Sequence, residues 1–177
     1  MDHLTKNQLL AVLNEAKREN ERDWLAIVLA YNHGLRISEV VALRACDVAG
    51  GFITVQRLKG SLKTTQPLIS HENPLLNEKT AVAKWIKCLS AKDRVIGIER
   101  SMLGKLFEKY ARQARLPLHL RHFHVLKHSI CHHVIATAGI ENLRQYVGHK
   151  SIQSTGQYLK VGDMEASAVC QAAIAAL

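Results

Sequence analysis

Arg36 is the first residue along the chain whose type and setting could act on a phosphate. It stands between Gly34, a residue type that often ends helices, and Ser38, a residue type that often begins them. An arginine in such a bend can direct its planar guanidinium at a phosphate and donate two hydrogen bonds at once. Glu39 is close enough in sequence to orient it. The same pattern also fits a surface arginine with a local ion pair.

Lys59 and Tyr158 could supply a proton and a nucleophile. Lys59 precedes Gly60 in a predicted hairpin tip, where a loop lysine can reach into a site and act as an acid, although most loop lysines are simply solvated. The oxygen of Tyr158 could attack an electrophile if neighbouring cations stabilise its phenolate. A tyrosine on a short polar helix near the C-terminus is also commonly half-buried packing. Neither residue type decides the function by itself.

Histidines are concentrated late in the chain, with seven of the ten between residues 119 and 149. His128 and His132 are four residues apart, as two metal ligands on one helix face could be. The stretch contains no HExxH motif. Its one carboxylate, Glu141, and its one thiol, Cys131, have no spacing that marks a third ligand. We therefore expect no metal and no other cofactor.

The elements that must position these residues are mainly helical. Apolar spacing and capping residues predict helices from the Thr5 cap onwards and over about 23–33, 38–43, 78–89, 101–115, 124–138, 142–147 and 151–158. A turn at 50–51 precedes a predicted strand over 52–55, and a turn at 59–61 separates it from a second strand over 64–69. Pro67 suits the edge of a sheet. The predicted fold class is mainly α with a small antiparallel β-sheet (α+β), in a single domain over residues 1–177.

The charge of the chain favours a polyanionic partner. The 177 residues include 24 Lys and Arg against 15 Asp and Glu, a net charge of +9. Such a balance attracts nucleic acid first and an anionic membrane second, although some basic proteins bind no polyanion. Double-stranded DNA is the partner we expect.

The remaining composition indicates an intracellular location. The four cysteines form no CxxC pair and are expected to be reduced and buried. The first 23 residues are too polar for a signal peptide, and no apolar run approaches the ~20 residues of a membrane span. We expect a cytoplasmic protein that associates with the nucleoid when it is bound to DNA.

Five ordered motifs resemble the tyrosine recombinases, also called phage integrases. That family has G-L-R-x-S-E, a hairpin lysine, H-x-L-R-H, L-G-H and a tyrosine nine residues after the last histidine. The corresponding segments here are Gly34-Leu35-Arg36-Ile37-Ser38-Glu39, Lys59-Gly60, His124-Val125-Leu126-Lys127-His128, Val147-Gly148-His149 and Tyr158. The resemblance extends from about Thr5 to the C-terminus, and it implies the fold of the family's catalytic domain.

The resemblance also implies a reaction, the cutting and rejoining of DNA during site-specific recombination. By the resemblance, Tyr158 attacks a DNA phosphate to give a 3′-phosphotyrosyl bond, and Arg36 and His149 contact the non-bridging oxygens. His124 handles the tyrosine proton, and Lys59 protonates the departing 5′-hydroxyl. Positioned cations are needed because the attack increases the negative charge on the phosphate.

The chain departs from the family pattern in three ways. Lys127 occupies the position of the second arginine, which keeps the charge but loses the two-pronged fork. Arg121 or Arg144 could compensate. The segment 139–148 is about two residues shorter than usual, which could shift His149. We expect no N-terminal core-binding domain before the catalytic domain, as in short bacterial recombinases that invert DNA switches; a fragment or a relic of a mobile element would also fit.

Other functions remain compatible with the sequence. A catalytically weak or inactive paralogue could bind DNA as an accessory or regulator, because Lys127 replaces an arginine. A DNA-relaxing or end-resolving relative would use the same tyrosine chemistry, and an unrelated helical DNA-binding protein is the remaining alternative. The apolar tail over 164–177 is predicted to pack as a helix. The resemblance implies that it links subunits into a dimer or tetramer on DNA.

Overall fold

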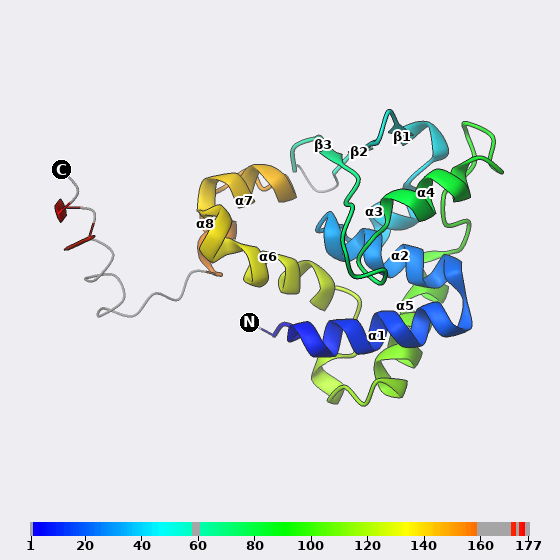
Figure 1. Ribbon diagram of the computed structural model, residues 1–177, viewed down its shortest axis with the longest axis horizontal. Coiled ribbons are helices and arrows are strands. Elements are labelled where there is room, and N and C mark those ends of the chain that lie inside the picture. Colours follow the sequence, from blue (N-terminus) through cyan, green and yellow to red (C-terminus); the bar gives the residue numbers. More distant parts are fainter. Residues whose placement is uncertain (1, 58–60, 159–170, 173, 176–177) are drawn as a thin grey trace.

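The fold is a helical assembly with one small sheet (Figure 1). The computed structural model describes residues 2–57, 61–158, 171–172 and 174–175. The described helices are α1 (Lys6–Glu19), α2 (Glu21–Asn32), α3 (Ile37–Ala42), α4 (Lys79–Ile86), α5 (Arg100–Gln113), α6 (Val125–Ala138), α7 (Ile140–Val147) and α8 (Gln153–Gly156). Short 3-10 turns cover Ala45–Asp47 and Leu118–Leu120. The predicted class, mainly α with a small antiparallel sheet, is confirmed.

Helix α2 is the centre of the core. Residues 23 to 32 are all buried, because α1, α5 and α6 pack around this helix. The side-chain oxygen of Asn20 caps its first turn, accepting hydrogen bonds from the backbone N–H groups of Arg22 and Asp23. The helix is followed by Gly34 in the left-handed region (φ 58°), which turns the chain towards α3. The end of α2 thereby fixes the position of Arg36.

The sheet has three antiparallel strands in the order β1 (Val48–Ala49), β2 (Phe52–Val55) and β3 (Thr64–Pro67). Ile53 and Val55 on alternate positions of β2 are buried, as a period of two requires. Strand β3 is at an edge, so Pro67 is accommodated as predicted. The two residues of β1 were too short a run to predict from composition.

Two expectations from the sequence need correction. Helix α3 begins at Ile37 with Arg36 as its cap, one residue before the predicted region 38–43, because the Glu39 carboxylate accepts the backbone N–H of Arg36 at 2.8 Å. Cys46 and Cys88 are exposed, whereas Cys131 is buried as expected. Cys46 lies within the 3-10 turn Ala45–Asp47, and Cys88 lies two residues after the end of α4.

The helices that the structure describes are all too short or too polar to cross a membrane. Figure 1 shows the arrangement that matters for the site: α6, α7 and α8 lie together at one end, and β3 approaches α7. The start of α3 lies between these two groups. The site is therefore assembled from segments that are far apart in sequence.

Candidate functional site

A pocket of about 370 Å³ lies where the start of α3, the first turns of α6 and the segment after α7 meet. Five of the six predicted catalytic residues line it: Arg36, His124, Lys127, His149 and Tyr158. The sixth, Lys59, lies outside the described residues. The described residues that line the pocket include no Asp or Glu. The pocket therefore presents cations and neutral hydrogen-bonding groups to whatever enters it.

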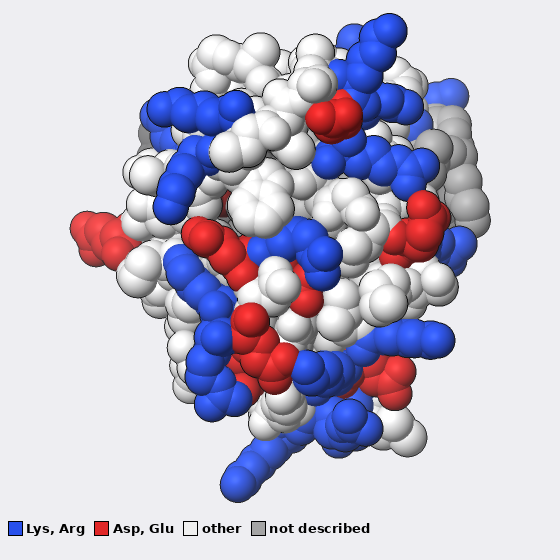
Figure 2. Space-filling view, turned by 90° about the vertical axis from the view of Figure 1, so that its right-hand side faces the viewer, with Lys and Arg blue, Asp and Glu red and all other residues white. Residues whose placement is uncertain are grey.

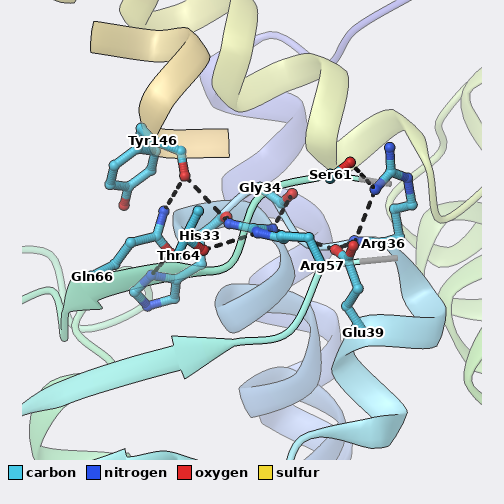
Figure 3. Close-up of polar contacts among 9 residues, drawn as sticks. All are labelled: His33, Gly34, Arg36, Glu39, Arg57, Ser61, Thr64, Gln66 and Tyr146. Carbon is cyan, nitrogen blue, oxygen red and sulfur yellow. Dashed lines mark hydrogen bonds and ion pairs between the residues drawn. The ribbon is translucent and has the colours of Figure 1, made fainter. Parts of the chain in front are cut away.

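Arg36 is held at the entrance of the pocket by Glu39. Its Nη1 donates to Glu39 Oε1 at 3.1 Å and to Ser61 Oγ at 3.5 Å (Figure 3). The Arg36 side chain is 26% exposed, whereas the Glu39 side chain is fully buried. Because Glu39 also caps α3, one carboxylate fixes both the helix start and the guanidinium direction.

Arg57 lies under the pocket with its whole side chain buried (Figure 3). Its guanidinium donates to the backbone oxygens of His33, Gly34 and Tyr146 at 2.9, 3.1 and 3.3 Å. It also donates to Thr64 Oγ1 at 3.0 Å and to Glu39 Oε2 at 3.3 Å. This one side chain therefore joins the end of α2, the start of α3, β3 and the end of α7.

Lys127 differs from every other cation of the site in its surroundings. It is 2% exposed, and its Nζ has no hydrogen-bond partner among the residues that the structure describes. Burial, followed by the charges of the nearby Arg36 and Arg57, lowers the pKa of Lys127 to about 8. At pH 7 the ammonium is still mostly protonated. The pocket thus contains a buried positive charge that is not neutralised by a hydrogen-bonded acid.

His149 is held by the turn that ends α7. Gly148 has φ 70°, and a Cβ there would lie 2.8 Å from the backbone oxygen of Leu62, so only glycine fits. The Leu62 N–H donates to the Gly148 oxygen at 3.0 Å, which ties this turn to the chain before β3. His149 Nδ1 is 3.0 Å from Thr155 Oγ1, and burial followed by Lys127 lowers the pKa of His149 to about 4. The imidazole is neutral at pH 7.

Tyr158 faces His128 across the pocket. Its hydroxyl is 2.8 Å from His128 Nδ1, while His124 packs edge-on against His128 with ring centroids 4.4 Å apart. Tyr158 is 7% exposed. Burial, followed by the neighbouring Cys131 thiol, raises the pKa of Tyr158 above its ordinary value. The phenol is therefore protonated in this state.

Sequence reasoning missed two residues that the structure brings into the site. Arg57 continues the inward alternation of Ile53 and Val55, so the strand period could have placed it inside. His128 was named as a possible metal ligand and as the last residue of a family motif but was given no catalytic role, although it lies one helical turn after His124. Among the described residues, no group of three or more His, Cys, Asp or Glu side chains could hold a metal ion.

The two arginines considered as substitutes for the second family arginine do not line the pocket. Arg144 pairs with Glu141 and donates to the His149 oxygen at 3.1 Å. Arg121 donates from Nε to the Leu116 oxygen at 2.7 Å and lines a different hollow beside α5. Lys127 and Lys150 are the described lysines that line the same pocket as Arg36, and Lys127 is the buried one of the two.

The positive charge of the site contrasts with another part of the surface. Figure 2 shows the end of the molecule that lies on the right in Figure 1, and there acidic side chains lie among the Lys and Arg side chains. The pairs Arg18–Glu15 and Arg22–Asp23, near the junction of α1 and α2, are of this mixed kind.

The pocket combines cations, a protonated tyrosine and neutral histidines. This set can bind an anion and present a hydroxyl nucleophile to it.

Comparisons with known proteins give one consistent result. The family model described as Phage integrase family matches residues 2–165. The type 1 fimbriae regulatory protein FimE of Escherichia coli K12 is 30% identical over 152 residues, which cover 77% of this chain and 73% of that protein. The tyrosine recombinase XerA of Pyrococcus furiosus is 26% identical over 165 residues, 89% of this chain and 57% of that protein.

Solved structures share the fold. The crystal structure of XerA recombinase superimposes with a TM-score of 0.74 at 17% identity, covering 96% of this chain and 62% of that one. The lambda integrase catalytic core has a TM-score of 0.67 at 18% identity, covering 84% of this chain and 92% of that one. The chain thus spans about three fifths of the length of the XerA proteins that it matches.

Proposed function

The chain belongs to the phage integrase family, and on that premise we propose that it cuts and rejoins double-stranded DNA in site-specific recombination. The observation that carries the proposal is the pocket in which Tyr158 lies with Arg36 and the unpartnered ammonium of Lys127. A buried cation without a partner is costly, and an entering phosphodiester offers the oxygens that satisfy it.

The proposed step begins with attack of Tyr158 Oη on a DNA phosphorus. The Oη–P bond forms, the P–O5′ bond breaks, and the product is a 3′-phosphotyrosyl bond with a free 5′-hydroxyl. Arg36, Lys127 and His149 stabilise the charge on the non-bridging oxygens. His124 lines the same space, and by the family resemblance it handles the tyrosine proton. Lys59 protonates the leaving oxygen. The new diester is equivalent in bond type to the old one, so the reverse attack reseals the strand without ATP.

The experiment is a search for the covalent intermediate. A library of nicked duplexes with inverted half-sites of randomised sequence removes the need to know the target. Protein is incubated with the library, and adducts that survive denaturation are recovered and sequenced. We expect protein joined to the 3′ side of one enriched sequence. Absence of any adduct, together with specific DNA binding, would favour the second candidate function below.

The second candidate is a catalytically weak or inactive paralogue that binds DNA as an accessory or regulator. The observation that favours it is Lys127, because a lysine cannot align two donors on one phosphate. This protein would bind DNA with the strong salt dependence of phosphate contacts and form no adduct. Binding without attachment distinguishes it from the recombinase.

Self-association on DNA is part of the proposal. The predicted helix of the tail, residues 164–177, falls largely outside the described residues. An apolar hollow of about 420 Å³ between α2, α6 and α7, lined in part by Tyr31, Ile130 and Val134, offers a surface against which an apolar segment could pack. Removing the tail should reduce dimer or tetramer formation on DNA, measured by sedimentation. Unchanged assembly would exclude this role.

A further inference from the structure

The partner of the Tyr158 hydroxyl is His128. Nδ1 of His128 lies 2.8 Å from Oη, within the range of a good hydrogen bond, and both rings line the pocket with their centroids 5.8 Å apart. His124, one turn earlier on α6, contacts the ring of His128 instead. The helix therefore presents two histidines in sequence, and the second one reaches the nucleophile.

Both groups of this hydrogen bond are neutral at pH 7. Burial, then the neighbouring His124, His122 and Lys127, lower the pKa of His128 to about 4, so its imidazole is neutral. The raised pKa of Tyr158 keeps the phenol protonated, even though the Arg36 charge acts in the opposite sense. In the tautomer of His128 that carries its ring proton on Nε2, the hydroxyl donates to the unprotonated Nδ1, and this is the tautomer that the inference uses. A hydroxyl that donates to a neutral imidazole has the ground-state geometry of general base catalysis.

We infer that His128, and not His124 as the family resemblance implies, accepts the proton of Tyr158 during strand cleavage; the inference otherwise rests on the proposed function. As the Oη–P bond forms, the phenolic proton passes to Nδ1 and His128 becomes an imidazolium. The P–O5′ bond breaks, its electron pair stays on O5′, and the acid of the proposed function protonates that oxygen. In rejoining, the deprotonated acid takes back the proton of the 5′-hydroxyl as O5′ attacks phosphorus, the Oη–P bond breaks, and the imidazolium returns its proton to Oη.

The surrounding charges make this base dependent on the substrate. Without DNA, Lys127 and the other histidines disfavour a charge on His128. A phosphodiester bound beside Lys127 and Arg36 brings a negative charge into the pocket and opposes their effect. The pKa of His128 then rises towards the range in which it can accept a proton. Tyr158 is thereby activated when a phosphate is in place to be attacked.

The first test replaces the base while keeping the hydrogen bond. In His128→Asn the amide oxygen can accept the Tyr158 hydroxyl, but it cannot take up the proton. Removing a general base typically lowers a rate on the order of 10² to 10⁴-fold, and we expect adduct formation to slow by at least ~10²-fold. The matched control is His132→Asn, one turn further along α6 and exposed, which should cleave at the wild-type rate. Circular dichroism and thermal melting check that both variants are folded.

The second test separates proton transfer from positioning. A fluorinated tyrosine at position 158 has a more acidic phenol and needs less help from a base. We expect it to recover most of the deficit of His128→Asn and none of the deficit of Arg36→Lys. The wild-type rate should also fall below a pKa that is missing from the pH profile of His128→Asn. Equal deficits with both tyrosines would assign His128 a positioning role and overturn the inference.

A measurement without DNA distinguishes this inference from the proposed function. The ¹⁵N spectrum of His128 should show an unprotonated Nδ1 whose signal moves in Tyr158→Phe. If wild type forms adduct and His128→Asn is as fast, the inference fails while the proposed function stands. If wild type forms no adduct with any library sequence, the proposed function fails and the catalytic role of His128 fails with it, whatever the spectrum shows.

Discussion

Arg57 and Lys127 are both buried cations near the same pocket, and they differ in what surrounds them. Arg57 donates to three backbone oxygens, a threonine and a carboxylate, in a network that spans four elements. Lys127 has no hydrogen-bond partner among the described residues. A satisfied network fixes the positions of the groups it joins, whereas an unsatisfied charge lowers stability and is retained where function needs it.

The site has two parts, a floor formed by Arg57 and Glu39 and a working face formed by Lys127, Tyr158 and His149. Arg57, together with Glu39, fixes where Arg36 and the turn before His149 lie. Lys127, Tyr158 and His149 line the space above. We therefore expect substitutions in the floor to act on stability first and substitutions on the working face to act on chemistry first.

The largest expected effect on stability follows removal of Arg57. Arg57→Met leaves the buried Glu39 carboxylate without one of its two cations and removes a donor from three backbone oxygens, of which that of Tyr146 keeps the Gln66 amide at 2.7 Å. Breaking a buried pair in this way typically costs about 3–5 kcal/mol, and we expect that loss in urea unfolding.

The matched control is Arg94→Met. Arg94 forms an ion pair with Glu99 in which both side chains are largely exposed, so the expected change is below about 0.5 kcal/mol. A loss for Arg57→Met as small as for Arg94→Met would remove the distinction between floor and surface.

The histidines of the working face make stability depend on pH. The pKa values of His128 and His149 are lowered to about 4 from 6.5, so the unfolded chain binds protons more readily than the folded one. Their contribution is fully present above pH 6.5 and is lost as the pH falls through 6.5 towards 4. With allowance for partial solvent exposure, we expect about 2 kcal/mol less stability at pH 5 than at pH 7.5.

Urea unfolding at the two pH values measures this loss. His149→Asn should reduce the difference, whereas the same replacement of the exposed His119 should leave it unchanged. A difference that persists undiminished in His149→Asn would assign the pH dependence to other groups.

Lys127→Met should have opposite effects on stability and chemistry. The apolar side chain removes a charge whose pKa burial has lowered to about 8, and a gain of about 1–2 kcal/mol in unfolding free energy is expected. Covalent attachment to DNA should fall sharply, because the second cation is lost. Lower stability in this variant would show that the ammonium has a partner in solution.

The smallest expected effect is a gain. Lys127→Arg restores two aligned donors, and we expect adduct formation to rise ~10-fold, about 1.4 kcal/mol of barrier. Lys127→Ala should be slower than wild type. If the arginine variant is no faster and the alanine variant is unimpaired, position 127 does not contact the phosphate.

The sequence predicted the helical class, the sheet and the candidate residues because each leaves a local signal. Gly34 and Glu39 mark the bend at Arg36, and the nine-residue spacing marks Tyr158. The contact between His128 and Tyr158 joins residues 30 apart and depends on how α8 lies against α6, which no local pattern encodes. Arg57 shows a second limit, since inward alternation could have placed it inside but could not have named its five acceptors. The role of Lys59 stays a prediction, because it lies outside the described residues.

The measurement that tests the central claim most directly is covalent attachment by Tyr158→Phe. The substitution removes one oxygen from a buried ring, so DNA binding and folding should stay nearly unchanged. Wild type and variant are compared on the DNA site enriched from the nicked library, by denaturing gel for attachment and by mobility shift for binding. We predict that the variant binds like wild type and forms no adduct, and that peptide mapping of the wild-type adduct finds DNA on Tyr158. Attachment that persists in the variant would contradict the account.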